Sequence, residues 1–250
     1  DLPYLDLLTD VLDELDTPTH TAQQLNTLRS TWLGDSRVLL DFWTGRQEGA
    51  PCHAKLTMSL SLLERSLQKA VELGGEWLYD TQLTGPAAEA AFARVLSQQK
   101  LNMEQQFIQQ GNAYAAVRAS AHYNVENAAS ERCSGVSYYH FLCDLLEKAD
   151  WAGLGTKLET LRAQVLQHAQ LTVSLHGSEQ ALDTLRTLLP GSRFAAQERD
   201  AAQPYAEPLT PPVNEAFIID GGVNYAVQVW PMERRSDRKV LAVSYTHLRA

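Results

Sequence analysis

Five consecutive residues, His176 to Gln180 (HGSEQ), come closest to a metal-binding pattern in this chain. They match the inverted zinc motif H-x-x-E-H, except that Gln180 stands where the second histidine belongs. That motif needs both histidines four residues apart on one helix, so that their nitrogens converge on zinc while the glutamate activates water. Here we expect His176 to end a strand and Glu179 to begin a helix, and an amide is a poor zinc ligand. We therefore interpret the match as chance.

A second group of potential ligands lies on one predicted helix. His140, Cys143 and Asp144 occupy positions i, i+3 and i+4, and Cys133 lies a few residues upstream. One helix face could present these side chains to zinc. Cys143 lies beside the apolar stripe of that helix, however, where an unreactive buried thiol is the more common role. Both interpretations stay open, and the buried thiol is favoured.

Ser66 and Lys69 match the S-x-x-K signature of penicillin-binding enzymes, in which the serine is the nucleophile. The partner motifs S-D-N and K-T-G are missing from the sequence, so we interpret the match as an exposed helix turn. The sequence also has no G-x-G-x-x-G, P-loop or C-x-x-C pattern. These patterns therefore assign no catalytic, cofactor-binding or metal-binding residue.

The composition of the chain disfavours several classes of function. Its 250 residues carry a net charge of -9, and 44% of them are hydrophobic, enough for one large or two modest domains. Nucleic-acid binding is disfavoured because phosphate contacts need clustered Lys and Arg. The three cysteines, Cys52, Cys133 and Cys143, give no disulfide framework and suit a reducing compartment. No apolar run reaches the ~18 residues of a membrane span, and we recognise no signal peptide.

The spacing of apolar residues predicts the elements of the first half of the chain. Gly74 and Gly75 are expected to end the helix that precedes them. Gly111 weakens its helix by about 1 kcal/mol relative to alanine, so we expect a bend or a frayed segment there. The predicted elements are a helix over 3–16, a helix over Ala22–Thr31, strands over Arg37–Trp43 and Lys55–Leu63, a helix over Leu63–Leu73 and a long helix from Pro86 to about Ala129.

The rest of the chain alternates between helices and strands. The carboxylates of the first helix, Asp6, Asp10, Asp13 and Glu14, lie mostly off its apolar stripe and are expected on a solvated face. The order of elements predicts an α+β fold, with helices packed on a mostly antiparallel sheet. The later elements are helices over Ser137–Lys148, Gly155–His168 and 179–189, the last with Ser178 as N-cap, a strand over Leu171–Leu175 and strand-like residues over Asn214–Trp230.

Ordered landmarks span residues 1–243. The most specific lie in Gly111–Leu146, as GNAYAAVRA (111–119) and SGVSYYHFL (134–142). DLPYLDLLTDVLDELDT opens the chain, and LTVSLHGSEQAL (171–182) and NEAFIIDGGVNYA (214–226) follow. Together they resemble the pitrilysin/insulinase clan of zinc metallopeptidases (inverzincins), specifically its presequence-protease branch. In this context we interpret Arg118, His122, His140 and Cys143 mainly as parts of a packing spine.

This resemblance implies a domain organisation. Members of the branch resemble a clamshell of four α+β domains, whose two halves enclose a chamber. The chain then looks like a C-terminal-half fragment, with the third domain at 1–190, a Pro-rich linker at 191–213 and the truncated start of the fourth domain at 214–243. The last residues, 244–250 (SYTHLRA), resemble the translated read-through of a sequencing adapter, and we expect them to be foreign to the fold.

The resemblance also implies a function. The zinc motif belongs to the N-terminal half of such enzymes, so this fragment is expected to bind no zinc, to be inactive alone and to form chamber wall around unfolded oligopeptides. Its partners would be the N-terminal catalytic half of the same polypeptide and the peptide substrate, with no nucleic acid and no membrane. We expect an intracellular location, cytoplasmic in a bacterium and mitochondrial or plastid in a eukaryote. The alternative is a structural or interaction subunit of the same clan that has lost zinc; a free-standing helical binding module is disfavoured by the truncated ends.

Overall fold

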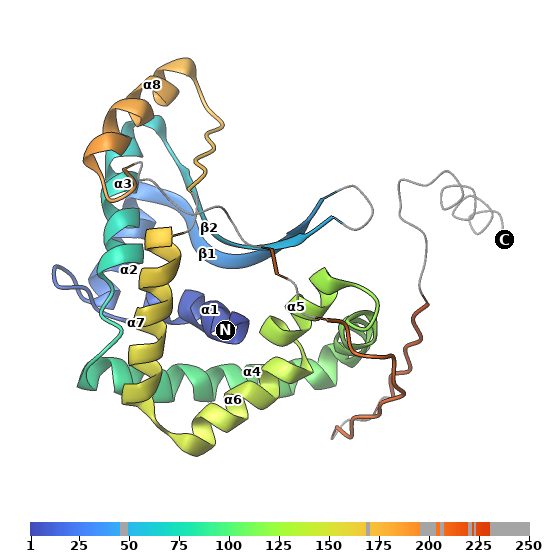
Figure 1. The fold of residues 1–250 in the computed structure, drawn as a ribbon. Helices are drawn as coiled ribbons and strands as arrows, with labels where there is room; N and C mark the ends of the chain where they lie inside the picture. Colours follow the sequence, from blue (N-terminus) through green and yellow to red (C-terminus); the bar gives the residue numbers. More distant parts are fainter. Residues whose placement is uncertain are drawn as a thin grey trace, which may run out of the picture.

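A computed structural model describes residues 1–45, 50–168, 171–195, 204–205, 208–219, 222 and 224–230. Helices dominate, and they pack around one two-stranded antiparallel sheet, which confirms the predicted α+β fold. The long helix α4 (Pro86–Ser120) and the hairpin β1–β2 (Leu33–Thr44 and Cys52–Leu62) lie on opposite sides of α1 (Leu2–Val11) (Figure 1). No helix in the described ranges is long and apolar enough to cross a membrane.

The hairpin is longer than the two predicted strands. Its register pairs Val38 with Met58 and Leu40 with Leu56, and a bulge interrupts the ladder at its start, between Leu33 and Asp35. Val38, Leu56 and Met58 lie on one face, because side chains alternate along a strand, and they pack against the core. The opposite face is more polar, which is typical of an antiparallel sheet with one solvated side.

Two helices come before the hairpin. Pro3 lies in the first turn of α1, where a missing backbone N–H costs nothing. The helix continues into a 3-10 turn, Leu12–Glu14. Helix α2 (Ala22–Trp32) begins at Thr21 with a capping box, in which the Thr21 side chain accepts from the Gln24 N–H and the Gln24 side chain accepts from the Thr21 N–H.

The prediction that Gly74 and Gly75 end a helix is wrong. After a short 3-10 turn (Glu64–Ser66), helix α3 (Leu67–Gly75) passes directly into a π-helical turn, Glu76–Asp80. A Cβ on Gly74 would lie 3.1 Å from the Met58 side chain, so this glycine allows close packing of α3 on the sheet.

The predicted helix from Pro86 to Ala129 is two helices. Helix α4 ends at Ser120, and α5 (Val125–Ser134) follows after a short turn. The Asn124 side chain accepts hydrogen bonds from the N–H groups of Glu126 and Asn127, which makes a new helix start more favourable than continuation. The predicted bend is confirmed, since Gln110, next to Gly111, has non-helical angles (φ -132°, ψ 30°).

The remaining helices agree with the predicted ones within a few residues. Helix α6 (Val136–Lys148) ends at Ala149 in a left-handed conformation, and α7 (Trp151–His168) follows it. Helix α8 (Glu179–Leu188) has the predicted N-cap, since the Ser178 side chain accepts from the Ala181 N–H, and a 3-10 turn over Leu189–Gly191 follows.

The strand predicted over Leu171–Leu175 is wrong, because these residues have no regular secondary structure. The described residues between Asn214 and Trp230 also form no strand. Alternation alone does not make a strand; a partner edge must supply the hydrogen bonds. Besides the ladder between β1 and β2, the described residues form one bridge, between Cys52 at the start of β2 and Tyr205. Residues 231–250, which include the predicted foreign tail, lie outside the described residues, and the domain boundaries stay predictions.

The core lies where α1, α4, α6 and α7 meet. Its largest fully buried side chains are Trp77, Phe92, Leu7, Leu8, Leu12, Leu25, Leu83, Leu96, Leu142 and Leu158. The Arg29 guanidinium stacks on Trp77, with Cζ 3.4 Å from the ring centroid, and its Nη1 pairs with Asp13 at 2.5 Å.

Candidate functional site

The residues that resemble an inverted zinc motif do not share one helix face. His176 and Gly177 precede α8 in an irregular segment, and only Glu179 and Gln180 are helical. All three side chains of interest, His176, Glu179 and Gln180, are exposed. With Gln180 in place of the second histidine, these residues do not place two imidazoles one helical turn apart, and the absence of a zinc site here stays a prediction.

The potential ligands on α5 and α6 differ in how far they are exposed to solvent. His140 and Asp144 are exposed, Cys143 is half-buried and Cys133 is buried in α5. Burial raises the pKa of the Cys133 thiol well above its usual range, which disfavours the thiolate that would bind a metal. Within the described residues, no three His, Cys, Asp or Glu side chains lie close enough together to hold a metal ion.

The Ser66 and Lys69 pair does not form a nucleophile site. Ser66 is buried at the start of α3, with 3% of its surface exposed. Lys69 is exposed and pairs with Glu72 at 2.8 Å. The prediction of an exposed helix turn is therefore right for Lys69, which pairs with a carboxylate one turn along the helix. It is wrong for Ser66, which is buried.

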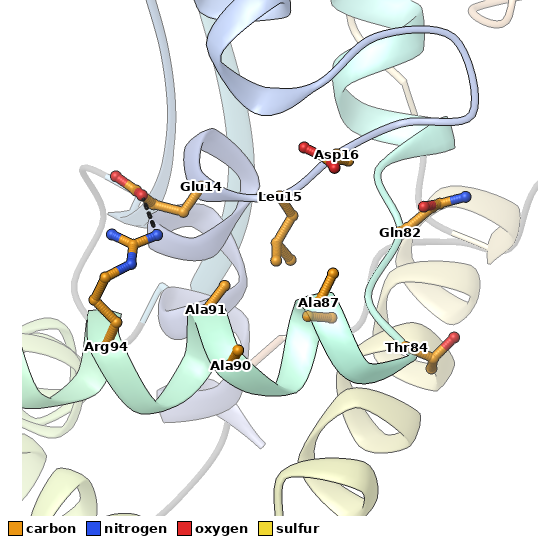
Figure 2. Close-up of a pocket in the computed structure, with 10 residues that line it drawn as sticks. Glu14, Leu15, Asp16, Gln82, Thr84, Ala87, Ala90, Ala91 and Arg94 are labelled. Atoms are coloured by element: carbon orange, nitrogen blue, oxygen red, sulfur yellow. Dashed lines mark hydrogen bonds and ion pairs between the residues drawn. The ribbon is translucent and has the colours of Figure 1, made fainter.

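An open groove of about 440 Å³ lies beside the N-terminal end of α4. Figure 2 shows its two walls, with α4 on one side and the segment after α1 on the other. Arg94 reaches across one end and pairs with Glu14 at 2.8 Å. The groove is lined by Glu14, Leu15, Asp16, Gln82, Thr84, Ala87, Ala88, Ala90, Ala91 and Arg94.

The lining of this groove is partly apolar and partly acidic. Four alanines of α4 lie along it, of which Ala88 and Ala91 are buried. The opposite rim carries the carboxylates of Glu14 and Asp16, and the Asp16 side chain also accepts from the Ala22 N–H at 2.7 Å. The lining contains no histidine, cysteine or lysine that could serve as a base or nucleophile.

Two carboxylates of α1 have perturbed proton affinities. Asp6 is half-buried and faces Cys133 of α5 and Tyr138 of α6; burial, with a smaller contribution from Asp10, raises its pKa to about 7. Part of Asp10 reaches solvent, but its carboxylate accepts from the Gln99 amide at 2.6 Å, and burial raises its pKa to about 6. The predicted solvated face is therefore wrong for Asp6, because α5 and α6 cover it.

Arg118, near the end of α4, is the centre of a polar network that joins α4, α5, α6 and Glu215. Its Nη1 donates to Ser137 Oγ at 3.0 Å and lies 3.2 Å from the buried Glu131 carboxylate. Its Nε and Nη2 donate to the two carboxylate oxygens of Glu215, at 2.7 and 2.8 Å. The hydrogen bonds from Arg118 lower the pKa of Glu215. Such two-pronged pairs are among the stronger polar contacts in proteins.

Residues 1–145 match the family described as associated with peptidases of family M16, subfamily C. The chain belongs to this family. The match confirms the predicted relationship to M16 peptidases. The chain is also 18% identical over 227 residues to Protein HypA of Clostridium perfringens. That alignment covers 91% of this chain and 23% of HypA, so the chain spans about a quarter of the length of that relative.

Sequence reasoning missed two features of this M16-associated chain. It placed Arg118 and His122 in a packing spine, whereas their polar atoms contact residues of the C-terminal segment, Glu215 and Thr210. Those partners are 88 or more positions away in the sequence, beyond any local pattern. Asp6 was also predicted to face solvent. Its neighbour Leu5 belongs to the apolar stripe of the helix, but the burial of Asp6 itself depends on packing by α5 and α6.

Proposed function

We propose that the chain is a non-catalytic, wall-forming region of a larger M16-type zinc metalloendopeptidase that degrades unfolded oligopeptides in a closed chamber. The observation that carries the proposal is the family match over residues 1–145, together with coverage of only 23% of the relative HypA. Zinc and its ligands would lie in the N-terminal half of the parent polypeptide, with glutamate as the general base. This chain would enclose the peptide when the two halves close.

The groove beside α4 is lined by four alanines and by the carboxylates of Glu14 and Asp16, so in this proposal it would be a contact for a cationic peptide. The net charge of -9 adds a field that favours cationic peptides. A presequence-type substrate and the presequence-protease branch are part of the proposal.

Metal content and peptidase activity test the proposal. The 250-residue chain, stripped with a chelator and dialysed against zinc, should retain far less than one equivalent and should hydrolyse no oligopeptide. The parent polypeptide should hold one zinc and lose activity in the chelator. Tight one-to-one zinc in the 250-residue chain, or chelator-sensitive cleavage by it, would contradict the proposal.

The alternative is a structural or interaction subunit of an M16 family that has lost zinc. The parent polypeptide distinguishes the two functions. If the parent carries H-x-x-E-H and cleaves peptides with zinc, the wall role holds. If the parent lacks the motif and stays inactive with added zinc, the structural subunit replaces it.

A further inference from the structure

The described residues 208–219 and 224–230 form an extended segment, here called the strap. It has no helix or strand of its own, yet it contacts the helices at three separate points. These are Thr210 with His122, Glu215 with Arg118, and Tyr225 with the kinked turn of α4. The order of the contacts shows that the strap runs antiparallel to α4.

Groups outside the strap hold the Arg118 guanidinium in the orientation that pairs with Glu215. Glu131 has only 3% of its surface exposed and holds Arg118 on one side, while its carboxylate also accepts from the Ser137 N–H at 2.9 Å. These partners occupy Nη1 and leave Nε and Nη2 directed at Glu215. A guanidinium has a rigid fork of donors, so fixing one end presets the other. An exposed surface ion pair contributes little to stability. The Arg118–Glu215 pair is half-buried and bidentate, and Glu131 and Ser137 fix its guanidinium.

The kink of α4 forms the second half of the docking surface. Tyr225 donates from its hydroxyl to the Ile108 carbonyl at 2.9 Å, on the turn where Gln110 leaves the helical conformation. Its ring occupies the space that a side chain at position 111 would need, because a Cβ on Gly111 would lie 2.5 Å from the Tyr225 ring. The glycine is therefore required by the ring of a residue far later in the chain.

We infer that α4, with Arg118 held from behind by α5 and α6, carries a specific docking surface for an extended segment with an acidic residue and, ten positions later, a tyrosine, and that this chain's own strap occupies it. Docking then fixes the point from which the polypeptide continues beyond Trp230. Docking of the strap requires neither zinc nor peptide hydrolysis, so it can be tested independently of the proposed function.

Limited proteolysis of the full 250-residue chain tests this inference. Chymotrypsin cleaves after Phe217 and Tyr225 when the strap is detached. If detachment is fast relative to cleavage, the cleavage rate is proportional to the fraction of molecules with a detached strap. Glu215→Gln and Tyr225→Phe should each speed up cleavage in the strap by about fivefold or more, since a hydrogen bond to a charged group or to a backbone carbonyl is lost. Phenylalanine at 225 keeps the cleavage site.

Gly111→Ala separates docking from overall stability. Alanine raises helix propensity, so the melting temperature should stay the same or rise, while strap cleavage speeds up because the Tyr225 ring is displaced. In the Gly111→Ala background, Tyr225→Phe should have little further effect, as expected for two changes that act on one contact.

Matched controls are Glu147→Gln, at an exposed position near the end of α6, and Tyr4→Phe, whose ring packs on Phe141. Both should be cleaved at the wild-type rate. Near-UV circular dichroism checks that every variant keeps its fold. Wild-type cleavage rates for Glu215→Gln, Tyr225→Phe and Gly111→Ala would overturn the inference, as would slower cleavage of Gly111→Ala.

Discussion

Asp6 and Asp10 lie one helical turn apart on α1, and the fold makes the deprotonated form of each less favourable. Burial is the main cause for both, and each lies near another acidic group, Asp10 for Asp6 and Asp13 for Asp10. The pKa of Asp6 in the folded chain, about 7, is above its ordinary value of 3.8. The folded state therefore binds more protons than the unfolded state between these values, and stability must fall as the pH rises through that window.

Asp6→Asn should remove this cost. At pH 7.5 we expect the free energy of unfolding to rise by about 1–2 kcal/mol, less than the full pKa shift implies because the carboxylate is only half-buried. At pH 4, where the wild-type Asp6 is already protonated in the folded state, the difference should nearly vanish. Urea unfolding at both pH values measures it.

Asp183→Asn is the matched control for Asp6→Asn, because Asp183 is exposed and pairs with Arg186, which is also exposed, in α8. Its effect should stay within about 0.5 kcal/mol at both pH values. If Asp6→Asn destabilises the chain at pH 7.5, the carboxylate makes a favourable contact and the burial argument is wrong.

At the scale of elements, short side chains at helix ends decide where helices begin. Thr21, Asn124 and Ser178 each accept from backbone N–H groups that have no partner inside their helix. Asn124 is the most consequential of the three, because it divides what the apolar stripe alone predicts as one helix. The division lets α5 turn back and place Cys133 and Glu131 against α1 and α4.

Asn124→Ala should therefore lower the free energy of unfolding by about 1 kcal/mol, within the range found for N-cap removal. Asn102→Ala is the control, since Asn102 is exposed within α4 and alanine is the better helix former there. Urea unfolding with helical circular dichroism measures both. A loss equal in the two variants would show that capping by Asn124 contributes nothing.

At the scale of the whole molecule, several large apolar side chains of the described residues are exposed. Trp43, Phe217, Ile218 and Trp230 are exposed by 58%, 48%, 102% and 67%. The hairpin also has two edges, and a two-stranded sheet rarely suffices alone. Exposed side chains of this size favour association with other apolar surfaces.

The isolated 250-residue chain should therefore self-associate. Size exclusion with light scattering at micromolar concentration should show mass above that of a monomer, and Ile218→Lys should reduce it. Gln228→Lys adds the same charge at an exposed polar position of the strap and should change little. A compact monomer for the wild-type chain would contradict this expectation.

The sequence alone determined the features that depend on neighbours along the chain. The apolar stripes of α1, α6, α7 and the part of α4 before its kink, the hairpin, the Ser178 cap and the bend near Gly111 all follow from residues within a few positions of one another. The ordered landmarks also revealed the M16 relationship. These predictions succeed because periodicity records which face of an element is buried, and capping depends on a few adjacent residues.

Only the tertiary structure decided features that depend on distant residues. Leu171–Leu175 alternates like a strand but has no ladder partner among the described residues, Gly74 serves packing against Met58, and Asp6 is covered by α5 and α6. The docking of the strap depends on Arg118 and Glu215, 97 positions apart. Local patterns do not encode such pairs, because burial and pKa at a site depend on what the fold brings against it.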